Sequence, residues 1–120
     1  MDGGFEDWQV HQWLQEVADA GWISLHYDSP GLDLITRAEI EGGGYTRFKM
    51  AFSQPANRTI WSLIDARFTG LLQTRLTHFG VWTDEFQGSL RASGRLPEAV
   101  TVLNGKGYIL HAGELALSIG

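Results

Sequence analysis

The chain contains no cysteine, so disulfides, a thiolate nucleophile and a cysteine zinc site are excluded. Basic residues are also few: nine stand against 14 acidic residues, and the formal net charge is −5. Because neutralising phosphates needs clustered Lys and Arg, no nucleic-acid partner is expected. No apolar run approaches the roughly 20 residues that a membrane-spanning helix requires, so no membrane partner is expected either.

The N-terminal residues 1–7 are acidic and lack the basic-then-apolar layout of a signal peptide, so secretion by that route is not expected. The absence of cysteine suits synthesis in a cytosol. At 120 residues, the chain is long enough for one hydrophobic core, and a single domain over residues 1–120 is predicted.

A helix is predicted over about residues 6–20, with Gly21 just after its end. Trp8 projects from the polar side of this helix, which leaves two interpretations: it folds back onto a neighbouring loop, or it contacts a partner. The apolar stripe, which we expect to be buried, consists of Val10, Trp13, Leu14 and Val17.

After the helix, alternating apolar residues and frequent turns predict short strands. The strand at 45–52 is expected to point Arg47 and Lys49 outward, and residues 60–68 are open between a strand and a helical turn. Leu96-Pro97 is expected to break a strand, Asn104-Gly105 to close a hairpin, and residues 28–31 to form a turn. The predicted strands lie near 22–27, 45–52, 75–83, 89–93, 100–103, 108–111 and 114–119.

These elements predict a mainly β fold, an antiparallel β-sandwich of the immunoglobulin-like or jelly-roll-like kind. It has about 7–8 strands, spans about residues 22–120, and follows the N-terminal helix.

Residues suited to catalysis or metal binding are present but do not form recognisable motifs. Four histidines, namely His11, His26, His78 and His111, show neither an H-x-H pair nor an H-E-x-x-H motif. Gly42-Gly43-Gly44 lacks the following Lys-Ser/Thr of a phosphate-binding loop, and no serine lies in a G-x-S-x-G elbow. We therefore predict no catalytic residues, no metal site, no cofactor and no enzymatic activity.

Five motifs occur in order along the chain. Residues 23–31 form a strand ending at Pro-Gly, 42–47 read Gly-Gly-Gly-Tyr-Thr-Arg, and 76–82 contain Thr-His-Phe-Gly. Residues 88–94 end in Ser-Gly, and 112–115 read Ala-Gly-Glu-Leu. In this order and spacing the chain resembles a family of tailed-phage virion proteins, tail-fibre or minor structural proteins. It departs from the family's pattern at 60–68, which is more apolar.

The resemblance implies a non-enzymatic structural component of a tailed-phage virion, a tail, fibre or capsid-decoration protein assembled in the host cytoplasm. It would act through repeated contacts with copies of itself and with other virion proteins. Large aromatic side chains and Arg anchor interfaces disproportionately, and several weak contacts per copy give high avidity in an assembly. The candidate interface residues are Trp8, Arg47, Lys49, Trp61 and Phe86.

An alternative function is a carbohydrate- or host-surface-binding β-sandwich module. In that case exposed aromatic rings would stack on the sugars of a host glycan. Coplanar Trp22 and Trp82 on one sheet face would distinguish this function from assembly.

Overall fold

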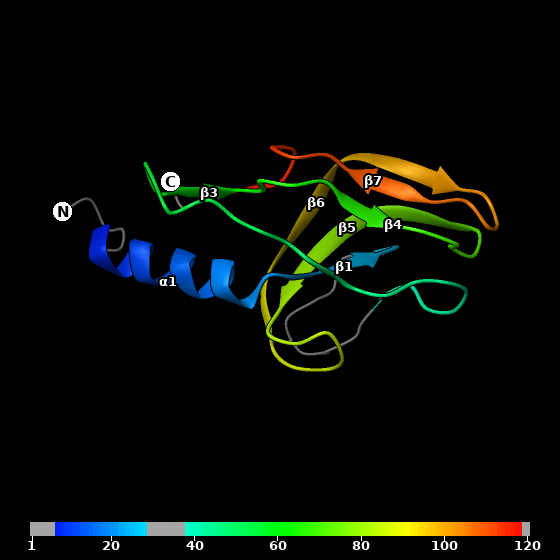
Figure 1. Ribbon diagram of the computed structural model, residues 1–120, viewed down its shortest axis with the longest axis horizontal. Coiled ribbons are helices and arrows are strands. Elements are labelled where there is room, and N and C mark those ends of the chain that lie inside the picture. Colours follow the sequence, from blue (N-terminus) through cyan, green and yellow to red (C-terminus); the bar gives the residue numbers. More distant parts are fainter. Residues whose placement is uncertain (1–6, 29–37, 119–120) are drawn as a thin grey trace.

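The computed structural model describes residues 7–28 and 38–118, and its architecture is mainly β with one N-terminal helix (Figure 1). Within these residues eight strands follow the helix, and every strand pair is antiparallel. The predicted fold class is therefore confirmed. Most of the predicted turn at 28–31, and Ile119 of the predicted last strand, lie outside the described residues.

Helix α1 (Asp7–Ala20) buries the apolar stripe only in part. Val10, Leu14 and Val17, spaced four and three residues apart, are at most 2% exposed and face the core. Trp13 keeps 36% of its surface exposed, so the prediction that it is buried is wrong. It lies one position to the side of Leu14, at the margin of the buried stripe.

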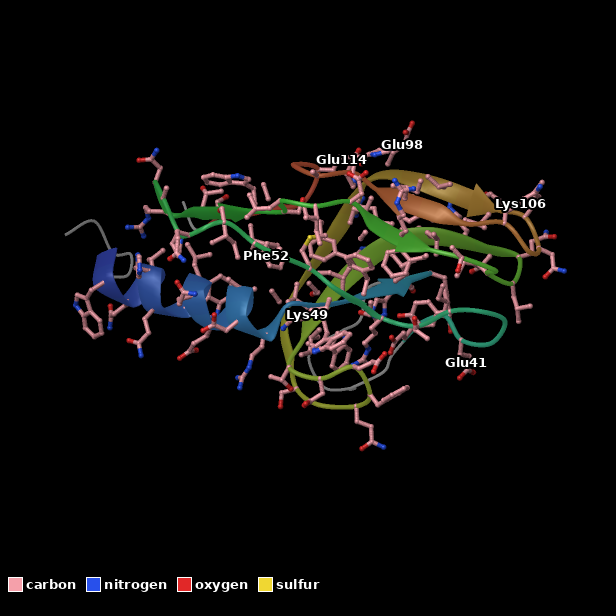
Figure 2. All side chains as sticks on the ribbon, in the orientation of Figure 1. Glu41, Lys49, Phe52, Glu98, Lys106 and Glu114 are labelled. Carbon is pink, nitrogen blue, oxygen red and sulfur yellow. The ribbon has the colours of Figure 1, made fainter. Side chains whose placement is uncertain are left out.

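The C-terminal end of α1 is closed by a glycine and a lysine. Gly21 has a φ of 69°, and its N–H donates to the Val17 carbonyl over 3.1 Å, as in the left-handed helix ending that glycine favours. Lys49 Nζ donates to the carbonyls of Asp19 at 3.0 Å and Ala20 at 2.7 Å. Figure 2 shows Lys49 beside this end of the helix, where a cation also suits the helix dipole.

The largest sheet has the strand order β2-β1-β5-β6. Its strands are β1 (Trp22–His26), β2 (Phe48–Lys49), β5 (Thr74–Trp82) and β6 (Leu90–Val102). Residues opposite each other on antiparallel strands point to the same face, and Ile23 lies opposite Val81 while His26 lies opposite His78. One face of the β1–β5 pair thus carries Ile23, Leu25, Phe79 and Val81, and the other carries Ser24, His26 and Trp82.

Two small sheets complete the fold. One joins β3 (Thr59–Trp61) to β8 (Ala116–Ser118), and the other joins β4 (Ala66–Phe68) to β7 (Tyr108–Leu110). Residues 60–68 therefore contribute two strands. In Figure 1, β3, β4 and β7 lie on one side of β1 and β5, which gives a sandwich-like arrangement. The core cluster unites both layers and includes Leu14, Ile23, Leu25, Ile60, Leu76, Val81, Leu110 and Leu115.

The predicted strand at 45–52 is reduced to the two residues of β2. The reason is that β1 shares its edge between two segments. β2 pairs with Trp22 and Ile23, whereas residues 38–40 bind the far end of β1 through Tyr27 N–H to the Ala38 carbonyl, at 3.0 Å. The edge of β1 thus leaves no space for a longer β2.

The predicted hairpin around Asn104-Gly105 is wrong in its pairing. The turn exists, with Gly105 at a φ of 83°, but β6 pairs with β5 and β7 pairs with β4. The turn is bound by the backbone of Leu71 instead. The Leu71 carbonyl accepts from Gly105 N–H at 2.7 Å, and the Leu71 N–H donates to the Lys106 carbonyl at 2.9 Å. The chain therefore crosses from one sheet to another at this turn.

The predicted break at Leu96-Pro97 is also wrong, because β6 runs continuously from Leu90 to Val102. The register with β5 shifts here: Leu76 lies opposite Val100, but His78 lies opposite Arg95. Two steps along β5 therefore face five steps along β6. Pro97 lies within this bulge, where its missing N–H breaks no ladder hydrogen bond.

Candidate contact surface

Three of the five candidate interface residues expose large apolar side chains. Trp8 on α1 is 65% exposed, Trp61 at the end of β3 is 38% exposed, and Phe86 between β5 and β6 is 75% exposed. They come from three separate elements, and Figure 1 shows α1 and the β5–β6 loop at different places on the molecule. The structure therefore distributes the predicted contacts over more than one surface.

Trp61 begins an apolar segment that the backbone holds in place. Leu63 and Ile64 follow it and are 51% and 43% exposed. Leu63 N–H donates to the Ala51 carbonyl at 2.8 Å, and Trp61 N–H donates to Ser53 Oγ at 3.1 Å. Because these exposed side chains stand on a bonded backbone, a partner could bind them without ordering the segment first.

Phe86 stands on the loop of residues 83–89, which Arg47 anchors. Arg47 Nη1 donates to the main-chain carbonyls of Asp84 at 2.9 Å and Gln87 at 2.8 Å. Ser89 N–H closes the base of the loop on Thr83 Oγ1 at 2.9 Å. The exposed ring of Phe86 is therefore presented from a fixed loop.

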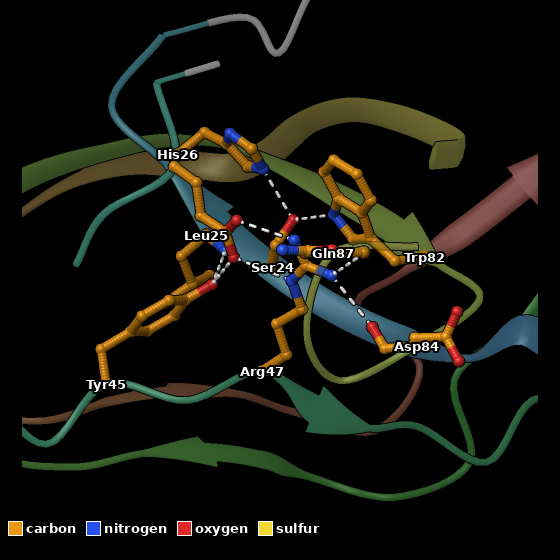
Figure 3. A network of polar contacts seen from close by, with 9 residues as sticks. Ser24, Leu25, His26, Tyr45, Arg47, Trp82, Asp84 and Gln87 are labelled. Carbon is orange, nitrogen blue, oxygen red and sulfur yellow. Dashed lines mark hydrogen bonds and ion pairs between the residues drawn. The ribbon is translucent and has the colours of Figure 1, made fainter. Parts of the chain in front are cut away.

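Arg47 itself is only 6% exposed, so the prediction that it points outward is wrong. Its Nε and Nη2 donate to the two carboxylate oxygens of Glu39, both at 2.9 Å, in a bidentate ion pair. Its guanidinium also lies 4.0 Å from the centre of the Trp82 ring (Figure 3). Paired charges and a covering ring compensate the cost of removing this cation from water.

The glycines before Tyr45 bring Arg47 to this position. Gly43 and Gly44 pass so close to residues 69–70 that a Cβ on Gly43 would lie 2.5 Å from the Gly70 carbonyl oxygen. Gly44 N–H donates to that same oxygen at 2.8 Å. Only glycine permits this approach, which directs the following residues toward β1.

Tyr45 fills the gap between the two segments on the β1 edge. Its hydroxyl accepts from Leu25 N–H at 3.2 Å and donates to Glu39 Oε2 at 2.5 Å. Burial, with the nearby Glu39 carboxylate, raises the pKa of the Tyr45 phenol well above its usual range. The phenol therefore stays protonated and continues to donate to Glu39.

A second polar chain joins the Trp82 ring to Ser24 and His26 (Figure 3). Trp82 Nε1 donates to Ser24 Oγ at 2.6 Å, and Ser24 Oγ lies 2.6 Å from His26 Nε2. The indole N–H can only donate, so Ser24 Oγ accepts from Trp82, and the direction of the Ser24–His26 hydrogen bond follows the tautomer of His26. All three side chains are 0% exposed, so this Ser–His pair stabilises the fold and offers no nucleophile to a substrate.

Ser24→Ala is expected to lower the free energy of unfolding by about 1–3 kcal/mol, because Trp82 Nε1 and His26 Nε2 both lose their buried partner. Urea denaturation of the purified protein measures this change. Ser93→Ala, at an exposed position of the same sheet, is the matched control and should stay within about 0.5 kcal/mol. Equal losses in the two variants would contradict the assigned hydrogen-bond chain.

Metal-ligating side chains do not gather in the described part of the chain. No three His, Asp or Glu side chains gather there in a way that could hold a metal ion. His78 Nδ1 lies 2.7 Å from Thr77 Oγ1, and His111 lies 3.7 Å from Asp65. Among the described residues, no helix has the length and apolar character needed to cross a membrane.

The described part of the chain is a small, mainly β, antiparallel fold that presents large apolar side chains on anchored segments. Comparison with protein families identifies it further. Residues 16–118 match the family described as podophage GP4 fiber I protein gp80, and the chain belongs to this family. The resemblance to tailed-phage virion proteins is thereby confirmed, and the family indicates a structural component of the virion. No curated protein matches the chain.

Proposed function

We propose that the chain is a non-enzymatic fibre subunit that assembles with copies of itself and with other virion proteins. The observation that carries this proposal is the family match over residues 16–118. The exposed apolar side chains of Trp8, Trp61 and Phe86 supply contacts of the kind that anchor interfaces. The same family favours a fibre over a capsid-decoration protein.

We leave Arg47 and Lys49 out of the proposed contact surface. Arg47 is buried against Glu39 and Trp82, and Lys49 binds the last carbonyls of α1. Their role is to hold the β5–β6 loop and the helix in place. The proposed contacts are therefore apolar, and we expect them to depend little on salt.

Trp8→Ala is expected to leave folding intact and to reduce incorporation into particles by roughly 10-fold, as for a buried aromatic anchor of an interface. The measurement is the amount of the chain in purified particles after complementation of a phage that lacks it. Gln12→Ala, an exposed polar position on the same helix, is the control. Normal incorporation of Trp8→Ala would remove this side chain from the proposed interface, and Phe86→Ala tests the second contact in the same assay.

A second candidate function is binding of a host-surface saccharide. The predicted platform of Trp22 and Trp82 does not support it, because Trp82 is 0% exposed. Tyr27 does support it: the side chain is 57% exposed and lines neighbouring cavities of about 550 and 400 Å³. An exposed aromatic ring beside a concave surface suits stacking on a sugar.

A further inference from the structure

The bulge between β5 and β6 forms a cavity. Between Leu76 and His78 on one strand, and Arg95 and Val100 on the other, β6 has three more residues than pairing requires. Leu96 turns into the core and is 5% exposed, while residues 97–99 arch outward. The concave side of this bulge, together with the end of β1, encloses a volume of about 400 Å³.

Two arginines line this cavity without a carboxylate partner in the part of the chain that the structure describes. Arg75 and Arg95 are exposed and form no ion pair there, whereas Arg47 pairs with Glu39 and Arg67 with Asp65. Arg95 lies opposite His78 in the register, so both point to the same face of the sheet. The cavity therefore offers two guanidinium groups to an anion, beside the carboxylates of Asp28 and Glu98 on its other walls.

The other walls add groups that bind sugars. Tyr27 contributes an exposed aromatic ring, and Thr77 and His78 contribute polar atoms. Asp28 and Glu98 also line the cavity and are suited to accept hydrogen bonds from hydroxyl groups. Burial, with the nearby Glu114 and Glu98 carboxylates, raises the pKa of Tyr108 to about 12, and Figure 2 shows both glutamates on the same side of the molecule.

We propose that this cavity binds the anionic group of an acidic saccharide, a sugar carboxylate or a sugar phosphate. Arg75 and Arg95 bind the anion, and the Tyr27 ring stacks on the sugar. The cavity lies near the lower end of the range for small-ligand sites, about 300–1,000 Å³, which suits roughly one or two sugar rings. This proposal rests on the second candidate function and not on fibre assembly.

A concave site with mixed charge favours a saccharide over an acidic protein surface. A partner strand or helix would need the two arginines on a flat, exposed surface. Here the arginines border a recess that is also lined by two carboxylates. The two carboxylates can accept hydrogen bonds from the hydroxyl groups of a sugar, which are donors that a run of acidic peptide side chains lacks.

Isothermal titration of the full chain tests the proposal with five probes. They are oligomers of glucuronic acid, glucose 6-phosphate, neutral glucose oligomers, inorganic phosphate and a polyglutamate peptide. Saturable binding of the uronate oligomer or the sugar phosphate, with none of the neutral oligomer, is the expected result. Binding of inorganic phosphate alone, or equal binding of polyglutamate, would overturn the proposal, as would the absence of binding to all five.

Variants locate the binding. Arg95→Gln is expected to weaken binding of the acidic sugar by at least about 10-fold, the loss typical of one charge-assisted hydrogen bond. Arg91→Gln is the control, because Arg91 is exposed on the same strand but does not line the cavity. Equal weakening in both variants would indicate general attraction of anions and contradict the site. Fibre assembly is read separately, by incorporation of Trp8→Ala into particles.

Discussion

Replacing Arg47 by methionine is expected to lower the free energy of unfolding by about 3–5 kcal/mol. The change leaves Glu39 with a carboxylate that is 11% exposed and has lost two hydrogen bonds to the guanidinium. The loop carbonyls of Asp84 and Gln87 also lose their donor, and Trp82 loses the cation over its ring. Urea denaturation monitored by tryptophan fluorescence measures the loss.

The double variant Arg47→Met with Glu39→Met separates the ion pair from the rest of the network. Removing both charges should restore part of the stability, since no uncompensated carboxylate remains buried. Arg91→Met, at an exposed arginine without an ion pair in the described residues, is the matched control and should change stability by less than about 0.5 kcal/mol. If Arg47→Met were as stable as this control, the network would have no structural importance.

Leu14→Ala should have the second large effect, a loss of about 2–5 kcal/mol, because it opens a cavity where α1 packs on the core. Leu14 is 0% exposed. Trp13→Ala should cost less despite the larger side chain, since Trp13 is 36% exposed and water already reaches part of its ring. Thermal and urea unfolding of the two variants measure the difference.

Trp8→Ala is the control for helix propensity on the exposed side of α1 and should leave the melting temperature nearly unchanged. The expected order of destabilisation is therefore Leu14, then Trp13, then Trp8. A larger loss for Trp13 than for Leu14 would contradict the assignment of the buried helix face.

Local patterns predicted much of the fold because the forces behind them are local. Helical spacing and a glycine stop located α1, and alternation located β1 and β5. The pairing of β7 could not be read from Asn104-Gly105, because the choice between β6 and β4 depends on contacts distant in sequence, such as those of Leu71. Pro97 alone predicts a break in the strand. The bulge that accommodates this proline depends on the register between two strands, which the local sequence does not report.

The exposure of the candidate side chains was predictable only in part. Trp8, Trp61 and Phe86 are large apolar residues in polar surroundings, and each is exposed. The alternation of Arg47 with apolar neighbours predicts a place on the outer face, but its actual place depends on Glu39, Trp82 and the loop that it binds. No local signal reports partners that lie up to 40 residues away.

The hold of Arg47 on the β5–β6 loop has a consequence for variation among fibres. Arg47 donates only to main-chain oxygens of this loop, those of Asp84 and Gln87. These hydrogen bonds therefore do not depend on which side chains stand at the apex of the loop. The residue at position 86 could be exchanged, or a short epitope grafted beside it, while the scaffold beneath kept its shape. Substitutions at this apex would therefore alter the exposed surface of the loop without refolding the domain that carries it.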